Sequence, residues 1–392
     1  MYRRVLHRSL CTATTTSSEA STTSIKTISR DLYKESNFTR LVEKFKKASE
    51  LERFRTKSGI YEDTVRRLAS AKRFSCVRDI LDHQKKYPDI DNEGFCSRII
   101  TLYGKSRMYR HARKLFDEMS QRNCTRTVLS FNALLAAYLH SRKFDSVQTL
   151  FKELPKELSV EPDLVSYNIL IKALCETGSF DSGLEMLEEM EKKGVNPDSI
   201  TFNTLLDGLY AKGRFEDGER LWVSMRGKGI APDIRTCNSR LMGMAFEKKT
   251  KEAVEFLEEM KKDGVEPDVF SFNALIKGFV NEGNLEGAKK WFGEIGKSEF
   301  DPHKVTYATL IPFLCEKGDL KTAHEVSKDI FNHKLRVDGS LLQLVVDKLV
   351  AESMVSEAEE IVELGKTNKY CRYKLNLAGA EGAEEAEEKK SE

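Results

Sequence analysis

The sequence predicts an all-α solenoid built from helical hairpins, and three observations carry that prediction. Residues of four kinds recur at a step of 35 residues, once 36, through the middle of the chain. Within one step, apolar residues follow the i, i+3, i+4, i+7 spacing of a helix face, and Gly or Pro separates these runs. A period of this length indicates stacked supersecondary units, none of which buries its apolar face alone.

The recurring residues mark equivalent positions in successive units. A step shared by four residue types is not expected by chance, so it defines a structural repeat. These residues are Pro162, Pro197, Pro232, Pro267 and Pro302; Asn132, Asn168, Asn203, Asn238 and Asn273; Met190, Met225 and Met260; and Gly194, Gly229 and Gly264.

Residues 199–233 show the local structure of one unit. A first apolar helix face ends at Gly213, and a second ends before Gly229 and Pro232, which are residues that stop a helix. The two faces consist of Phe202, Leu205, Leu206 and Leu209, and of Gly218, Leu221, Trp222 and Met225. Each unit is therefore predicted to be a helical hairpin.

The same frame places about nine units along the chain and predicts helical repeats over residues 31–373, with degenerate units at the edges. Residues 31–58 are expected to form a further partial hairpin, with Asp31 as the N-cap of its first helix. The units begin near Gly59, Glu93, Val128, Leu164, Ser199, Ile234, Val269, Lys304 and Gly339. This assignment leaves no room for a second folded domain.

Both ends of the chain differ from the repeats in composition. Residues 1–30 hold Arg3, Arg4 and Arg8 among apolar residues, then a Ser/Thr/Ala-rich stretch, with a single acidic residue. This composition is typical of an organellar transit peptide, so we expect disorder and delivery to the mitochondrial matrix. The alternatives are the chloroplast and a disordered cytosolic tail. Residues 374–392 are expected to be an acidic, disordered tail.

Composition and motifs exclude several classes of protein. Lys and Arg total 64 against 62 Asp and Glu, so the net charge of +2 gives no whole-protein basic field. No apolar run approaches the ~18 residues of a membrane span. Eight Cys without a CxxC pair exclude a disulfide scaffold and a zinc ribbon. Nucleotide-binding, zinc-protease and deaminase motifs are absent, so we expect no enzyme activity, cofactor, metal or small-molecule substrate.

The segments that begin at Leu164 and Ser199, LVSYNILIKALCETGSFDSGLEMLEEMEKKGVNPD and SITFNTLLDGLYAKGRFEDGERLWVSMRGKGIAPD, closely resemble the pentatricopeptide repeat. They share its 35-residue length, one more than the tetratricopeptide repeat, its aromatic-Asn-x-Leu sequence and its Gly-x-x-Pro-Asp ending. Nearly uniform units resemble the P-type subfamily, which is typically organellar and plant-rich. The resemblance implies a right-handed superhelical solenoid of helix-turn-helix repeats that binds single-stranded RNA along a concave groove.

In that family the fifth and the last residue of a repeat together choose one base, as in other helical-repeat readers of RNA. Asn with Asp favours uracil, so four successive pairs predict a run of four U. Ala308 and Gln343 depart from the family's pairs, which leaves a U-rich readable site of about five or six nucleotides. The pairs are Asn132 with Asp163, Asn168 with Asp198, Asn203 with Asp233 and Asn238 with Asp268 for uracil, Ser97 with Thr127 for a purine, and Asn273 with His303 for a pyrimidine.

The second residue of each repeat is implied to pack against the faces of the bases. Residues two and five lie i, i+3 on a helix and share one face, and an Asn amide both donates and accepts, which suits the edge of uracil. The alternatives are that each Asn bonds locally to backbone between hairpins, that each Asp is an N-cap, and that the second residues pack between repeats. The second residues are Leu129, Val165, Ile200, Arg235, Phe270 and Val305.

The predicted groove is poor in positive charge. The thirteenth residue, commonly Lys in this family, is a clear cation only at Lys105. Because phosphate neutralisation supplies much of nucleic-acid affinity, we expect weak binding by the chain alone, with Lys172 and Lys277 compensating in part. The thirteenth residues are Lys105, His140, Glu176, Ala211, Phe246, Asn281 and Glu316.

A short P-type chain with a weak groove is similar to the members found in plant mitochondrial ribosomes. This resemblance implies a role in translation within the small ribosomal subunit, with mRNA or rRNA and small-subunit proteins as partners and no membrane. The alternatives are a free organellar factor for RNA stability or processing, and a protein-binding helical-repeat scaffold.

Overall fold

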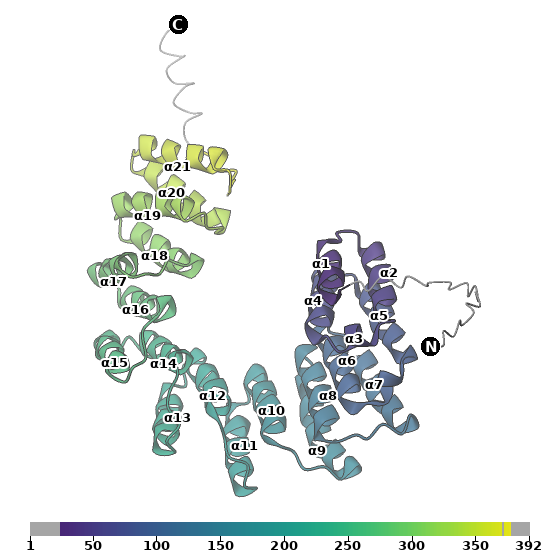
Figure 1. The fold of residues 1–392 in the computed structure, drawn as a ribbon. Coiled ribbons are helices and arrows are strands. Elements are labelled where there is room, and N and C mark those ends of the chain that lie inside the picture. The colour runs from purple at the N-terminus through teal and green to yellow at the C-terminus, as the bar shows by residue number, and fades with distance from the viewer. Residues whose placement is uncertain (1–23, 371, 378–392) are drawn as a thin grey trace, which may run out of the picture. The chain divides into compact units, whose positions relative to one another are not determined.

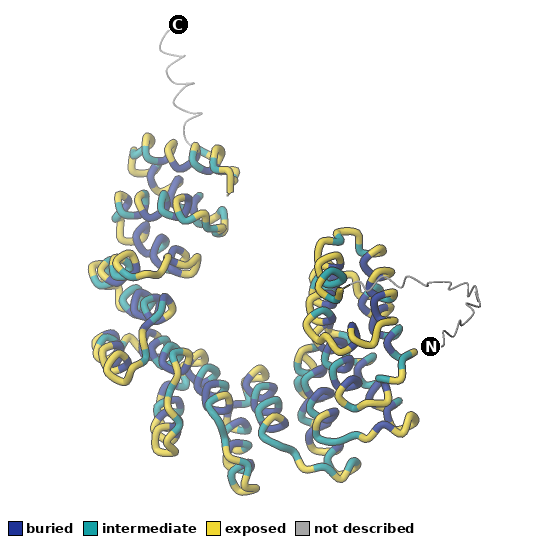
Figure 2. The backbone as a smooth tube through the Cα atoms, viewed as in Figure 1, coloured by how far each residue is buried: buried dark blue, intermediate teal, exposed yellow. Residues whose placement is uncertain are grey.

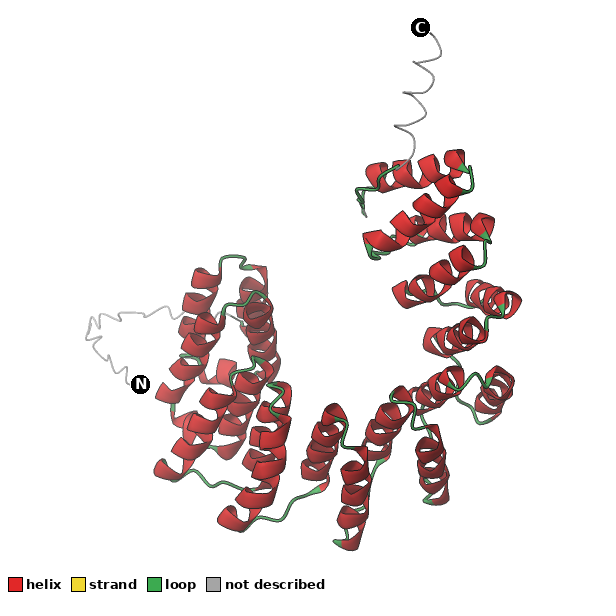
Figure 3. Ribbon diagram, turned by 180° about the vertical axis from the view of Figure 1, so that it is seen from behind, coloured by secondary structure: helices red, strands yellow, loops and turns green. Residues whose placement is uncertain are grey.

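The computed structural model describes residues 24–370 and 372–377 (Figure 1). Within these ranges all regular secondary structure is helical, with twenty-one α-helices and two short 3₁₀-helices (Figure 3). The chain divides into two compact units, the N-terminal unit (residues 24–160) and the C-terminal unit (residues 161–377). The predicted all-α class is confirmed, whereas most of the predicted presequence and acidic tail lies outside the described residues.

The N-terminal unit consists of a lead-in of short helices and three helical hairpins. In each hairpin a three-residue turn joins a first helix to a second, and the first helix α6 packs against the first helices α4 and α8. The elements are α1 (Ile25–Lys34), α2 (Phe38–Ala48), α3 (Glu52–Arg55), α4 (Ser58–Ser70), α5 (Phe74–His83), η1 (Gln84–Lys86), η2 (Pro88–Asp91), α6 (Glu93–Lys105), α7 (Tyr109–Gln121), α8 (Val128–His140) and α9 (Phe144–Leu158).

The contact between α6 and α8 is unusually close because it includes a glycine. A Cβ atom built on Gly104 would overlap the backbone and side chain of Ala137. Only a residue without a side chain allows this approach of the two helices.

The start of the chain's helical part differs from the prediction. Helix α1 begins at Ile25, and Asp31 lies inside that helix rather than at its N-cap, which is Ser24. The cause is tertiary packing: Leu32 is fully buried, and the Arg67 guanidinium on α4 donates hydrogen bonds to the carbonyl oxygens of Leu32 and Glu35. The predicted cap at Asp31 is therefore wrong, and the first helix starts inside the segment assigned to the presequence.

The C-terminal unit contains six helical hairpins whose first helices pack against one another in chain order. At several of the turns inside the hairpins the chain enters the left-handed region at glycine, as at Gly213 with φ of 70°. The elements are α10 (Leu164–Thr177), α11 (Phe180–Lys192), α12 (Ser199–Ala211), α13 (Phe215–Gly227), α14 (Ile234–Phe246), α15 (Thr250–Lys262), α16 (Val269–Glu282), α17 (Leu285–Lys297), α18 (Lys304–Glu316), α19 (Leu320–Asn332), α20 (Gly339–Ala351) and α21 (Val355–Thr367).

The first helices begin where the repeat frame predicts. Eight of the nine predicted starts are the first residue of a first helix, and Gly59 lies one residue inside α4. Toward the end of the chain, Leu375 is buried and the Val337 amide donates to the Tyr373 hydroxyl at 3.0 Å. The start of the segment predicted as a disordered tail is therefore packed on the last hairpin.

The buried residues follow the helix faces that meet inside and between hairpins (Figure 2). Cysteines lie among them: burial raises the pKa of the Cys96 and Cys237 thiols to about 12 and that of Cys175 to about 11. Such thiols stay protonated and act as small apolar residues. None of the described helices is both long and apolar enough to cross a membrane.

Candidate nucleic-acid interface

The last residue of four repeats caps the first helix of the next repeat. Asp163, Asp198, Asp233 and Asp268 are the N-caps of α10, α12, α14 and α16, and each forms a capping box with the Ser or Thr three residues later. In α12, for example, the Thr201 amide donates to Asp198 Oδ1 at 3.0 Å. The N-cap interpretation of these aspartates is therefore confirmed.

The fifth-residue asparagines join each of these caps to the preceding repeat. The Asn168 amide donates through Nδ2 to Asp198 Oδ1 at 3.2 Å, and the Thr201 hydroxyl donates to Asn168 Oδ1 at 2.6 Å. The same arrangement recurs one and two repeats later. Its members are Asn203 with Asp233 and Thr236, and Asn238 with Asp268 and Ser271. The expected local bonding of these asparagines is thus to side chains of the next repeat rather than to backbone.

This network limits what each asparagine can offer to a base. The hydroxyl of the next repeat donates to the amide oxygen, and the Asp carboxylate accepts from one of the two amide N–H groups. An amide oxygen has two lone pairs and the amide nitrogen has two N–H groups, so one acceptor position and one donor remain on each asparagine. Asn203 is only 8% exposed. Each pair therefore keeps hydrogen-bonding capacity on both the amide and the Asp carboxylate beyond the bonds of the network.

The network also lowers the pKa of two of its carboxyl groups. Partial burial raises the pKa of Asp198, but the hydrogen bonds from the Thr201 amide and hydroxyl and from Asn168 outweigh it, and the pKa is lowered from its ordinary value of 3.8. The pKa of Asp233 is lowered in the same way, by Thr236 and Asn203 against burial. Each of these two pairs therefore presents a negative acceptor at neutral pH.

The next pair, Asn273 with His303, breaks the pattern. The Thr306 hydroxyl donates to Asn273 Oδ1 at 2.7 Å as in the other repeats. Asn273 Nδ2, however, is buried and has no hydrogen-bond partner among the described residues. The reason is that His303 occupies the position where the other repeats have an Asp acceptor. An unsatisfied buried donor of this kind is destabilising.

The remaining two pairs involve the N-terminal unit. Asn132 lies in α8 of the N-terminal unit and Asp163 caps α10 of the C-terminal unit. Ser97 is 5% exposed, and Thr127 donates its amide and hydroxyl to the Glu93 carboxylate at 2.6 and 3.0 Å. Ser97 thus lies in the interior, and Thr127 takes part in a contact between α6 and α8.

The second residues form an exposed row beside the pairs. Val165, Ile200 and Phe270 are 51%, 59% and 52% exposed, although their helices bury the residues on the adjacent face. Arg235 is exposed and makes an ion pair with Asp207 at 3.2 Å, which holds its guanidinium against α12. The Phe270 and His303 rings lie 5.7 Å apart between centroids. Leu129 and Val305 are exposed at the same register.

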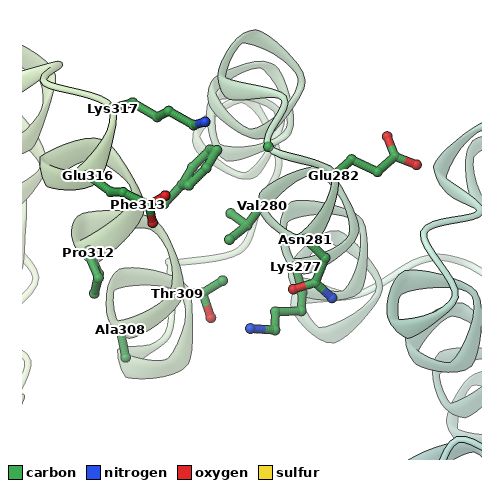
Figure 4. Close-up of a pocket in the computed structure, with 11 residues that line it drawn as sticks. Lys277, Val280, Asn281, Glu282, Ala308, Thr309, Pro312, Phe313, Glu316 and Lys317 are labelled. Atoms are coloured by element: carbon green, nitrogen blue, oxygen red, sulfur yellow. The ribbon is translucent and has the colours of Figure 1, made fainter.

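Cations near this row are few and mostly paired. Lys105 makes an ion pair with Glu62 at 3.2 Å, and Lys172 pairs with Glu176 at 3.3 Å. Lys277 makes no ion pair within the described residues; it reaches from α16 toward Thr309 on α18 in a hollow of about 440 Å³ (Figure 4). Of the two lysines predicted to compensate for the weak groove, only Lys277 offers an unpaired charge.

Family models match the repeat region. The model described as the PPR repeat family matches residues 126–176, 162–211, 198–245, 232–281 and 267–316, and the one described as the pentatricopeptide repeat domain matches residues 93–140. Together they span residues 93–316, which is more than half of the chain.

Individual relatives and a solved structure are similar to parts of the chain. Small ribosomal subunit protein mS78 of Arabidopsis thaliana is 58% identical over 161 residues, 41% of this chain and 40% of that protein. A pentatricopeptide repeat-containing protein of the same plant, designated mitochondrial, is 44% identical over 135 residues, 34% of this chain and 32% of that protein. The chain thus spans less than half the length of these curated relatives.

The fold is similar to the crystal structure of the pentatricopeptide repeat protein PPR10 from maize, with a TM-score of 0.53 and 20% sequence identity. The match covers 87% of this chain and 53% of the PPR10 chain. At this identity the similarity concerns the fold alone.

Proposed function

Because the chain belongs to the pentatricopeptide repeat family, we propose that it is a non-catalytic, single-stranded RNA-binding protein of mitochondria that acts in translation as a component of the small ribosomal subunit. The relative mS78, a small ribosomal subunit protein at 58% identity, supports the ribosomal role. The relative designated mitochondrial supports the location. The partners in this proposal are mRNA or rRNA and small-subunit proteins.

The observation that carries the RNA-binding proposal is the coincidence of two rows at one period. Exposed second residues and Asn–Asp pairs recur together in the repeats of α10, α12 and α14. A base that stacks on one exposed side chain meets the polar pair of the same repeat with its edge. Stacking contributes roughly 1–3 kcal/mol per base and is tolerant of sequence, so the pair decides the choice of base.

The chemistry of the pair fits uracil as a ligand. The free amide N–H can donate to a uracil carbonyl, and the Asp carboxylate can accept from the uracil N3–H. We propose a U-rich site of about five or six nucleotides, with the Asn–Asp pairs as its centre. Ser97 and Thr127 are left out of this site because one is buried and the other is bonded to Glu93.

A purified chain tests the readout. Replacing Asn203 by Ala removes the amide N–H from one repeat, and we expect about a fivefold to tenfold loss of affinity for a U-rich octanucleotide, the value of one hydrogen bond to a charged or base group. The matched control is Asn281→Ala, an amide on the first helix α16 that bonds to the Ala245 carbonyl instead of to a cap. Equal affinity for U-rich, C-rich and A-rich oligonucleotides would contradict the proposed base choice.

The ribosomal role is tested separately by gradient fractionation of mitochondrial lysate. The proposal expects the protein to sediment with the small ribosomal subunit and to crosslink to RNA there. Sedimentation as a free, RNase-sensitive particle would favour an RNA stability or processing factor. Sedimentation that RNase does not change, away from the ribosome, would favour a protein-binding scaffold.

A further inference from the structure

The two units carry opposite net charge. Residues 24–160 contain 29 Lys and Arg against 17 Asp and Glu, a formal charge of +12. Residues 161–377 contain 30 against 38, a formal charge of −8. The near-neutral total of +2 conceals this difference. The unit that holds most of the Asn–Asp pairs is therefore acidic, and the positive charge lies in the unit that holds almost none.

Five cations of the N-terminal unit lie at its three hairpin turns. The turns after α4, α6 and α8 carry a cation at a step of 35 residues, at Lys72, Arg107 and Arg142, and two turns carry a second cation beside it. All are exposed. We call these five residues the turn row: Lys72, Arg73, Arg107, Arg142 and Lys143.

The turn row keeps its cations at a conformational cost. Lys72, Arg107 and Arg142 have φ angles of 57°, 59° and 57°, in the left-handed region that disfavours side chains with a Cβ. Four of the six equivalent turn positions in the C-terminal unit are glycine; the other two are Lys248 and Ser353. These glycines are Gly178, Gly213, Gly283 and Gly318.

The charges of the turn row are not neutralised by the protein. None of its five members makes an ion pair with a carboxylate among residues 24–370 and 372–377, although Lys105 nearby pairs with Glu62. By contrast, Arg214 at a turn of the C-terminal unit pairs with both Asp181 and Asp217.

The members of the turn row lie along one edge of the unit. The first helices α4, α6 and α8 pack side by side, and each turn follows the C-terminal end of one of them. Lys143 Nζ lies 5.4 Å from the centre of the Tyr109 ring, directly after the preceding turn. Since packed helices lie about 8–10 Å apart, the row extends over roughly 20 Å.

We propose that the turn row is a docking edge for the phosphate backbone of double-stranded RNA, separate from the base-reading row. A rigid series of cations suits the regular phosphates of a duplex, and contact with them releases counterions. The edge has no exposed amide pairs, so it suits a ligand whose bases are hidden. The inference rests on the proposed function and deepens it. A second contact with structured RNA would compensate for weak RNA binding by the acidic C-terminal unit.

The test removes the charges without disturbing the fold. Replacing Lys72, Arg107 and Arg142 by Gly relieves the left-handed backbone while it deletes three cations, so the melting temperature should stay equal or rise. The matched control, K212S/K248G/K249S, deletes three cations from equivalent turns of the C-terminal unit. Both are made in the full chain and titrated with a mixed-sequence RNA duplex and with a U-rich octanucleotide at several salt concentrations.

For K72G/R107G/R142G we expect roughly tenfold or greater loss of duplex affinity, and a slope of log affinity against log salt that is smaller by about 2–3. The control should change the duplex affinity less than twofold. Unchanged duplex binding by K72G/R107G/R142G overturns the inference, and so does an equal loss in the control variant. The Asn203→Ala variant tests only the proposed base choice, and we expect it to bind the duplex normally. The two proposals can therefore fail independently of each other.

Discussion

The two units of this protein join neighbouring repeats by different chemistry, although their helices follow one period. In the C-terminal unit the Asn–Asp–hydroxyl network caps α12, α14 and α16 and joins each of them to the preceding first helix. In the N-terminal unit the Glu93 carboxylate alone accepts from the amides of Thr127 and Ser130 at 2.6 and 3.1 Å. One carboxylate on the preceding helix can therefore cap and join a repeat, where the C-terminal unit uses an amide, a carboxylate and a hydroxyl.

The units also differ in how closely their first helices approach. In the N-terminal unit Gly104 brings α6 against α8. In the C-terminal unit an equivalent approach occurs at Gly278 on α16, where an added Cβ would lie 3.4 Å from the Ala245 backbone of α14. Glycine thus brings first helices together in both units, and the tighter contact is the one between α6 and α8.

The largest effect should come from breaking the close packing of the N-terminal unit. Gly104→Ala places a Cβ against the backbone of Ala137, and we expect a loss of about 3 kcal/mol or more in the free energy of unfolding, as for other overpacked sites. Urea denaturation measures it. Gly227→Ala in α13 of the C-terminal unit has open space around the new Cβ and should be neutral or stabilising by up to about 1 kcal/mol. Equal losses in both variants would remove the contrast between the units.

The next effect concerns the caps of the C-terminal unit. Asp198→Ala removes an N-cap and leaves the Asn168 amide without its acceptor, so we expect a loss of roughly 2–3 kcal/mol. Asp198→Asn retains a capping oxygen and should cost less than half as much. The comparison in the N-terminal unit is Thr127→Ala, which leaves Glu93 bonded to two backbone amides and should cost about 1 kcal/mol. A larger loss of stability for Thr127→Ala than for Asp198→Ala would contradict the greater contribution that we assign to the Asp198 network.

A gain of stability should follow where the network is incomplete. His303→Asp gives the buried Asn273 Nδ2 an acceptor and restores the cap found in the four preceding repeats, and we expect a gain of about 1–2 kcal/mol in the free energy of unfolding. Thermal and urea melts of the full chain measure it. His303→Asn serves as the control, because it can cap the helix but lacks the carboxylate charge. A destabilised His303→Asp protein would show that Asn273 has another role.

The smallest effect is a dependence of stability on pH. A carboxyl whose pKa is lower in the folded than in the unfolded chain stabilises the fold above its ordinary pKa, and this contribution is lost as pH falls through the folded value. Asp198 and Asp233 behave in this way against an ordinary value of 3.8, and Glu93 against 4.5. Stability should therefore decline below about pH 4. The D198N/D233N variant should show a shallower decline between pH 4 and pH 2 in urea melts, and an unchanged slope would contradict these assignments.

The period, the starts of the first helices and the positions of the aspartate caps could all be predicted from the amino-acid sequence. These features depend on local patterns: apolar spacing, helix-stopping Gly and Pro, and Asp placed just before a helix. The charge difference between the units was also readable from the sequence once it was counted by segment. The cap expected at Asp31 was wrong because packing of Leu32 against the following helices extends α1 toward the N-terminus.

The hydrogen-bond partner of each polar side chain depends on how the hairpins stack, so it could not be predicted from the sequence. Asn168 and Thr201 are 33 residues apart in the sequence, and their hydrogen bond exists because one hairpin stacks on the next. The same stacking brings Gly104 against Ala137, leaves Asn273 Nδ2 without an acceptor and aligns the turn row along one edge. The physical reason is that a repeat pattern determines local backbone conformation, whereas contacts between repeats depend on the distance and register at which the packed helices come to lie.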